Sequence, residues 1–184
     1  MLSILSNSTV GTLIGTIVGA LSSIATTLLA NKYELKRRRE ERYSIRLEKL
    51  RQSQINELAA LEKHVVSWGR QMTRYYWSII KKLRQEREVS ASVHGDLEAS
   101  ELMRTEQVQI AFHSGLILDA RIREAIQDLT GDPCLSNDAE ELEGYVHRKT
   151  LELGTVSELL GARHRKLLLL GLSKEDIAVY GGTI

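Results

Sequence analysis

The sequence predicts an all-α protein with one N-terminal transmembrane helix that continues into a cytoplasmic antiparallel helical bundle. Two compositional observations favour helices: the 184 residues include one proline, and only 5% are aromatic. Strand-rich folds place prolines at turns and aromatic residues on their faces. A third observation is that hydrophobic residues recur at helical spacing along most of the chain after residue 57. This length suits one domain with an appendage and excludes a large multidomain enzyme.

The first predicted element is a transmembrane helix within 1–31, preceded by a short outside N-terminus. Residues 8–30 are 23 consecutive residues without a charge, which span about 34 Å as a helix and suffice for a bilayer. Basic residues follow this segment and none precedes it, so the positive-inside rule places the C-terminal part in the cytoplasm. We therefore expect a single-pass protein of the inner membrane.

This helix has two unlike halves when it is wound at 100° per residue. One half, the small face, consists of glycine, serine and threonine, and includes two overlapping GxxxG steps that let membrane helices approach closely. Its glycine edge predicts an oligomer interface of Gly11, Gly15, Gly19 and Ser22. Its hydroxyl edge predicts pore-lining positions at Thr12, Thr16, Ser23 and Thr27. The other half, the apolar face, carries leucine, isoleucine and valine and is expected to face lipid.

A long basic cytoplasmic helix is predicted over 32–88. The membrane-proximal basic residues at its start are positioned to contact lipid headgroups; they are Lys36, Arg37, Arg38 and Arg39. Further on, hydrophobic residues follow strict three-four spacing, which predicts a face that packs against other helices. This core seam consists of Leu58, Leu61, Val65, Trp68, Met72, Tyr75 and Ile79.

Residues 96–184 are predicted to form an acidic helical hairpin followed by a short C-terminal helix. The first helix should start near Asp96 or Ser100 and end before Gly131-Asp132-Pro133, because glycine and proline terminate helices. Asn137 with Glu140 is typical of a helix start, and Gly171 ends that helix. Residues 32–95 carry a net charge of +8 and residues 96–160 carry −9, so the basic and acidic helices should pack together.

Most enzyme classes find no support in the sequence. The chain contains no glycine-rich phosphate loop, no zinc-protease motif and no nucleophile elbow, and its single cysteine, Cys134, cannot form a thiolate metal site. We expect no metal and no cofactor. The catalytic candidates are Arg87 and His94, whose spacing falls within the Arg-x4–6-His window of HEPN ribonucleases.

The arrangement of a small-residue membrane helix, a helical cytoplasmic domain and the Arg87/His94 pair resembles small single-pass membrane accessory proteins of bacterial antiviral systems. These include CRISPR-associated proteins with a HEPN-like domain. The resemblance implies an oligomeric pore or membrane-disturbing effector that is controlled from the cytoplasm.

Three functions follow as hypotheses. The first is an oligomeric membrane effector that forms a pore or perturbs the membrane, with its bundle responding to a cytoplasmic protein or to a nucleotide or RNA signal. The second is a membrane-anchored scaffold that recruits a cytoplasmic partner, and the third is a membrane-tethered HEPN-like ribonuclease. The expected partners are lipid and further copies of the chain, and no sequence-specific DNA binding is expected.

Overall fold

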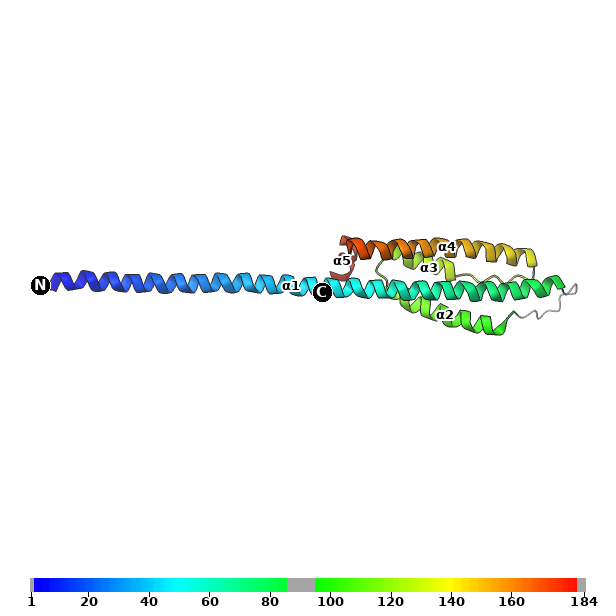
Figure 1. The fold of residues 1–184 in the computed structure, drawn as a ribbon, viewed down its shortest axis with the longest axis horizontal. Helices are drawn as coiled ribbons and strands as arrows, with labels where there is room; N and C mark the ends of the chain where they lie inside the picture. The colour runs from blue at the N-terminus through cyan, green and yellow to red at the C-terminus, as the bar shows by residue number, and fades with distance from the viewer. Residues whose placement is uncertain (1, 86–94, 182–184) are drawn as a thin grey trace. The chain divides into compact units, whose positions relative to one another are not determined.

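The computed structural model describes residues 2–85 and 95–181, with side chains for residue 12, residues 15–85 and residues 95–178. Every regular element in the described ranges is a helix (Figure 1), which confirms the all-α prediction. The chain divides into two units, unit 1 (Met1–Glu48) and unit 2 (Lys49–Ile184). The helices are α1 (Leu2–Gln85), α2 (Leu97–Leu116), α3 (Ala120–Thr130), α4 (Ala139–Leu170) and α5 (Lys174–Gly181).

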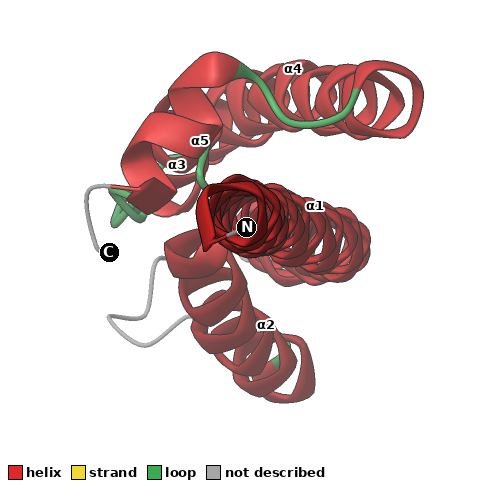
Figure 2. Ribbon diagram, turned by 90° about the vertical axis from the view of Figure 1, so that its left-hand side faces the viewer, coloured by secondary structure: helices red, strands yellow, loops and turns green. Residues whose placement is uncertain are grey.

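Unit 2 is a helical bundle, as the sequence predicts. Its part of α1 lies between α2 on one side and α4 on the other, with α3 and α5 on the side of α4 (Figure 2). Both neighbours run antiparallel to α1: Arg74 of α1 pairs with Glu98 near the start of α2, and Arg84 of α1 pairs with Glu143 near the start of α4. Each ion pair joins a basic residue of α1 to an acidic residue near the start of a neighbouring helix.

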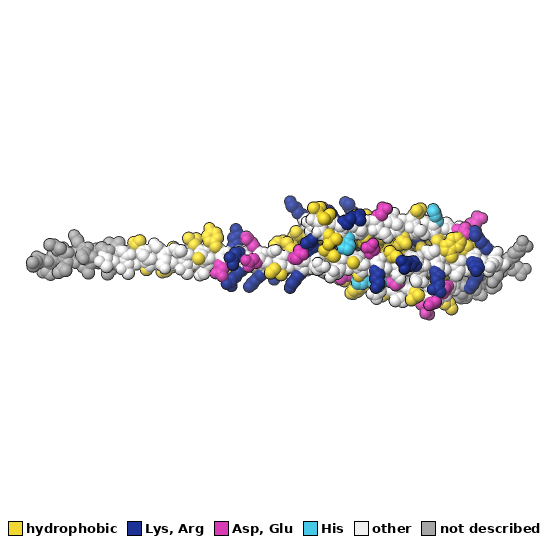
Figure 3. All heavy atoms as spheres, in the orientation of Figure 1, with side chains coloured by type: hydrophobic (Ala, Val, Ile, Leu, Met, Phe, Trp, Pro, Cys, Tyr) yellow, Lys and Arg dark blue, Asp and Glu magenta, His cyan; other side chains and the backbone are white. Residues whose placement is uncertain are grey.

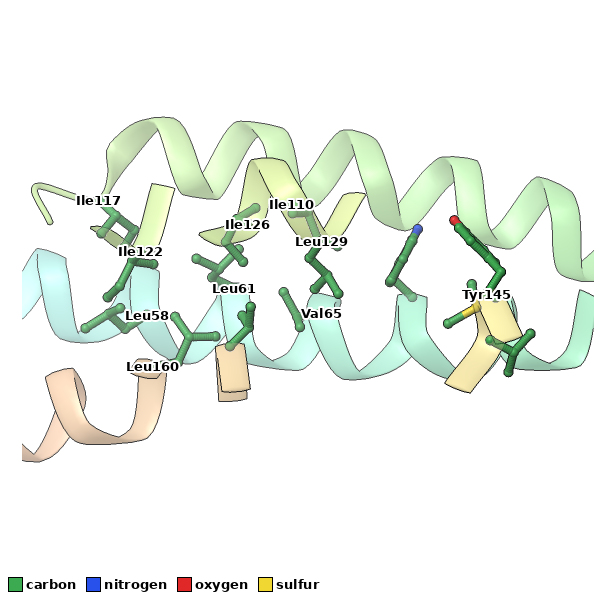
Figure 4. Close-up of a cluster of buried hydrophobic side chains, with 14 of the residues drawn as sticks. Leu58, Leu61, Val65, Ile110, Ile117, Ile122, Ile126, Leu129, Tyr145 and Leu160 are labelled. Atoms are coloured by element: carbon green, nitrogen blue, oxygen red, sulfur yellow. The ribbon is translucent and has the colours of Figure 1, made fainter. Parts of the chain in front are cut away.

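The core seam packs at the centre of unit 2. Leu58, Leu61 and Val65 of α1 meet side chains of α2, α3 and α4 (Figure 4). At its C-terminal end the most buried positions are Tyr76 and Ile80, whereas the predicted Tyr75 and Ile79 are only half-buried. An α-helix repeats every 3.6 residues, so a strict seven-residue pattern drifts by about 20° per heptad and the inward position moves on by one residue.

The segment predicted as the first acidic helix is two helices. Residues 117–119 separate α2 from α3 although they include neither glycine nor proline. Ile117 is only 1% exposed, and the Asp119 side chain accepts a hydrogen bond from the Arg121 amide and caps α3. The break between the helices is therefore stabilised by the burial of Ile117 and by the Asp119 cap, without the glycine or proline that usually signals a helix end in a sequence.

The other helix ends agree closely with the sequence. Asp96 caps α2 by accepting from the Ala99 amide at 3.1 Å. Helix α4 begins after Asp138, one residue beyond the predicted cap Asn137, and ends at Leu170. Gly171 follows with a φ of 77°, a left-handed conformation that glycine adopts without the steric cost of a Cβ.

The predicted transmembrane helix requires correction. Among the described residues, no helix includes a stretch long and apolar enough to cross a membrane. Seven of the sixteen residues 15–30 are glycine, serine or threonine, and charged residues begin at Lys32. The mean hydropathy of this stretch is therefore too low for a membrane span. This finding overturns the transmembrane helix predicted within 1–31 and the inner-membrane location that depended on it.

Candidate functional site

The described part of unit 1 is exposed apart from Leu47, which is partly buried. Every residue from 15 to 46 is exposed, although all belong to a helix. Charged side chains of both signs gather on a short stretch of this helix (Figure 3). Ten large hydrophobic side chains are exposed in the same range. They are Ile17, Val18, Leu21, Ile24, Leu28, Leu29, Tyr33, Leu35, Tyr43 and Ile45.

The predicted oligomer interface lies on this exposed helix. A Cβ added to Gly15 or Gly19 would meet no atom within 4 Å, so no contact inside the chain requires glycine there. Ser22 is exposed as well, and the exposure of Gly11 is not among the described features. At Gly15, Gly19 and Ser22 the glycine edge of the small face is therefore open to a second molecule.

The predicted pore-lining residues bond to their own helix. The Thr16 hydroxyl donates to the Thr12 carbonyl oxygen at 2.9 Å, and the Thr27 hydroxyl donates to the Ser23 carbonyl oxygen at 2.8 Å. Hydroxyls in the interior of a helix commonly bond in this way to the carbonyl four residues earlier. These hydrogen bonds stay within one helix, so the pore-lining role of these residues stays a prediction.

The predicted membrane-proximal basic residues form ion pairs along α1. The Arg37 Nε atom lies 3.2 Å from Glu41, and Lys36 lies 3.9 Å from Glu40. Arg38 pairs with Glu34. Such exposed pairs along a helix contribute only a few tenths of a kcal/mol each. The fourth predicted residue, Arg39, has no carboxylate partner within the described part of the chain.

The catalytic candidates Arg87 and His94 lie outside the described residues, so their catalytic role stays a prediction. Within the described ranges, no three His, Cys, Asp or Glu side chains are grouped so that they could hold a metal ion.

The structure brings together a polar cluster between α1 and α2 that the sequence analysis missed. The Nδ1 atom of His64 lies 2.6 Å from Glu106, and Nδ1 of His113 lies 2.7 Å from Glu57. The two imidazole rings stack with their centroids 5.3 Å apart. Each helix thus supplies one histidine and one glutamate, and the pairs cross between the helices.

A repeated spacing could have revealed this cluster. In α1 the glutamate precedes the histidine by seven residues, at Glu57 and His64, and in α2 the same interval separates Glu106 from His113. Seven residues place both side chains on one face of a helix. Burial alone would raise the pKa of Glu106, but hydrogen bonds from His64 and the Ser67 hydroxyl lower it below its usual value.

A cavity of about 470 Å³ lies beside α5. At its wall the buried guanidinium of Arg163, which is 8% exposed, pairs with Asp176 and with Asp119. Burial would raise the pKa of Asp176, but the bonds from Arg163 and Ser173 lower it. Three cationic and three acidic residues line the cavity, so their charges balance; they are Asp119, Arg121, Arg163, Lys166, Glu175 and Asp176.

Comparisons with protein families, with characterised proteins and with solved structures find no match to this chain.

Proposed function

We propose that this protein is an assembly scaffold. Unit 1 joins copies of the chain, and the resulting particle carries several copies of unit 2 for a partner protein. The observation that supports the proposal most directly is the exposure of every residue from 15 to 46, including ten large hydrophobic side chains. An exposed apolar surface of this extent is typical of a protein interaction site.

The composition of this helix also argues for association. Glycine, serine and threonine make up seven of residues 15–30, and all three favour helix less than alanine or leucine does. Isolated helices are marginal in water even when their composition is favourable, and most helical stability in proteins comes from packing. A helix of this composition is therefore expected to be stabilised by packing against another molecule.

Unit 2 supplies a second exposed surface. Val108, Phe112 and Leu116 recur at four-residue intervals on α2 and are 66%, 62% and 45% exposed. Apolar and aromatic side chains at this spacing on a helix are typical of contacts with proteins. Several copies on one particle would strengthen a weak contact through a high effective concentration.

Sedimentation equilibrium of the full-length chain over a range of concentrations tests the proposal. We expect a mass above that of a single chain at high concentration that decreases on dilution, because association depends on concentration. Tryptophan fluorescence, which reports on Trp68 and Trp77 of unit 2, should stay constant across the same range. A single-chain mass at every concentration would contradict the scaffold function.

A further inference from the structure

We infer that copies of this chain associate through a parallel coiled coil formed by the apolar face of unit 1. The inference rests on the proposed scaffold function and names the face, the partner and the direction of pairing. The partner is a further copy of the same chain. The contact surface, here called the assembly seam, consists of Ile17, Leu21, Ile24, Leu28, Asn31 and Leu35.

The assembly seam follows the heptad spacing of a coiled coil. Its members alternate four and three residues apart, so they lie along one side of two associating helices. In the notation of a heptad, leucines occupy the a positions Leu21, Leu28 and Leu35, and isoleucines occupy the d positions Ile17 and Ile24. These five side chains are between 51% and 64% exposed. Nothing in the described chain covers them.

In water, the burial of apolar surface favours association through the assembly seam over association through the small face. Removing apolar surface from water stabilises by about 25 cal/mol per Å², and leucine and isoleucine carry far more of it than glycine or serine. Close approach through GxxxG steps is effective where hydrophobic burial does not drive association, as in lipid. In addition, the Thr16, Thr26 and Thr27 hydroxyls already donate to carbonyl oxygens of their own helix.

Charged residues beside the assembly seam select the parallel direction. Every e position from residue 32 to 46 is basic, and every g position from residue 34 to 48 is acidic. In a parallel pair, the g position of one helix faces the next e position of its neighbour, which places Glu34 against Arg39 and Glu41 against Arg46. An antiparallel pair would instead place like charges together. Within the described residues, neither Arg39 nor Arg46 has a carboxylate partner in its own chain.

The residues at the inward positions also bear on the number and alignment of the helices. Leucine at a with isoleucine at d favours three or four helices over two. Asn31 is the polar residue of the assembly seam, and a parallel alignment brings the Asn31 side chains of all copies to one level. Arg38 and Arg42 occupy the next inward positions, so the apolar seam ends at Leu35 and the charged pairs continue beyond it.

Two adjacent leucines give a matched test of the contact surface. Leu28 lies on the assembly seam and is 64% exposed, whereas Leu29 lies outside it and is 56% exposed. We expect Leu28→Ser to weaken association of the full-length chain by about tenfold or more in dissociation constant. Leu29→Ser should change it by less than about twofold. Equal effects of the two changes on the sedimentation equilibrium would overturn the seam.

Disulfide cross-linking tests the direction. In a Cys134→Ser background, Ile17→Cys and Asn31→Cys are introduced one at a time, with Leu29→Cys as the control outside the assembly seam. A parallel coiled coil brings each seam cysteine opposite its own copy, so both variants should form disulfide-linked dimers rapidly under mild oxidation and the control should lag. An antiparallel pair can bring at most one of these positions together, so cross-linking at one position alone, or at neither, overturns the parallel direction.

The outcomes separate this inference from the scaffold function. A wild-type chain that stays monomeric overturns both. A wild type that associates while Leu28→Ser associates equally well keeps the scaffold and overturns the assembly seam. An assembly with the mass of three or four chains supports a coiled coil of three or four helices, and an assembly with the mass of two chains overturns that number. Unchanged tryptophan fluorescence in each variant shows that unit 2 remains folded.

Discussion

The two stretches of α1 carry similar hydrophobic spacing and have opposite surroundings. In unit 2, Leu61 is completely buried by α2, α3 and α4, whereas Leu21 in unit 1 is 61% exposed. The unit 2 stretch is covered by helices of its own chain, so its stability should not depend on concentration. Within the described residues the unit 1 stretch has no such cover, so its stability should depend on other molecules. Hydrophobic spacing in a helix therefore indicates that a face packs, but it does not indicate against which chain.

The largest expected effect comes from truncating one leucine in each stretch. Leu61→Ala should lower the free energy of unfolding of unit 2 by about 3 kcal/mol, because it removes buried surface and leaves a cavity. Leu21→Ala should change it by less than about 0.5 kcal/mol. Urea unfolding followed by tryptophan fluorescence measures both, since Trp68 and Trp77 lie in unit 2. Similar losses from the two changes would contradict the division into units.

The next effect concerns the buried ion pair of unit 2, which has no counterpart in the described part of unit 1. Asp176→Asn should cost on the order of 3 kcal/mol, because it removes a charged partner of the buried Arg163. The folded-state pKa of Asp176 lies below its ordinary value of 3.8, so its contribution is present above that pH and is lost as the pH falls below it.

Urea unfolding at neutral pH and near pH 3 checks both statements for the Asp176 variant. The exposed neighbour Glu175 serves as the control, and Glu175→Gln should behave like the wild type. If Asp176→Asn were as stable as the wild type at neutral pH, the ion pair would have no net stabilising role.

A smaller effect is expected at the glutamate–histidine cluster. Glu106→Gln should reduce the stability of unit 2 by about 1.5 kcal/mol, because it removes a charged acceptor from His64 and Ser67. The pKa of Glu106 is below its ordinary 4.5 in the folded chain, so the wild type should lose this contribution as the pH falls below that value. The melting temperature of the variant should therefore fall less steeply than that of the wild type as the pH is lowered (the acid limb). Glu101→Gln, at an exposed position of the same helix, should leave the acid limb unchanged.

The smallest effect distinguishes glycines of the two units. Gly19→Ala places a methyl group in open space and should raise helix stability by about 1 kcal/mol, seen as increased helicity in far-UV circular dichroism. Association should persist, because Gly19 lies outside the assembly seam. In unit 2, a Cβ at Gly69 would come closer to Leu153 Cδ2 than two carbon atoms can without a shift, so Gly69→Ala should give no such gain. Loss of association in Gly19→Ala would favour the small face as the interface.

Local sequence patterns predicted much of the fold. The three-four spacing identified Leu58, Leu61, Val65, Trp68 and Met72 as core residues. Capping and breaker residues located the start of α2, the end of α3 and both ends of α4 within one or two positions. The break at Ile117 escaped prediction because it depends on burial against other helices rather than on a residue that disfavours helix. The pairing of His64 with Glu106 depends on how two helices align in space, which neither helix encodes alone. The membrane prediction failed because an uncharged stretch was taken for a sufficiently apolar one.

The crossed pairs between α1 and α2 have a consequence for folding specificity. Hydrophobic side chains on two helices can mesh after one helix slides past the other by a turn, at modest cost. The contacts of His113 with Glu57 and of His64 with Glu106 form in only one register, and a slip would leave four half-buried polar groups without partners at once. The cluster therefore favours one alignment of α1 with α2 over alignments that are shifted by a turn. Burial of Leu58 and Ile110 alone would not distinguish these alignments.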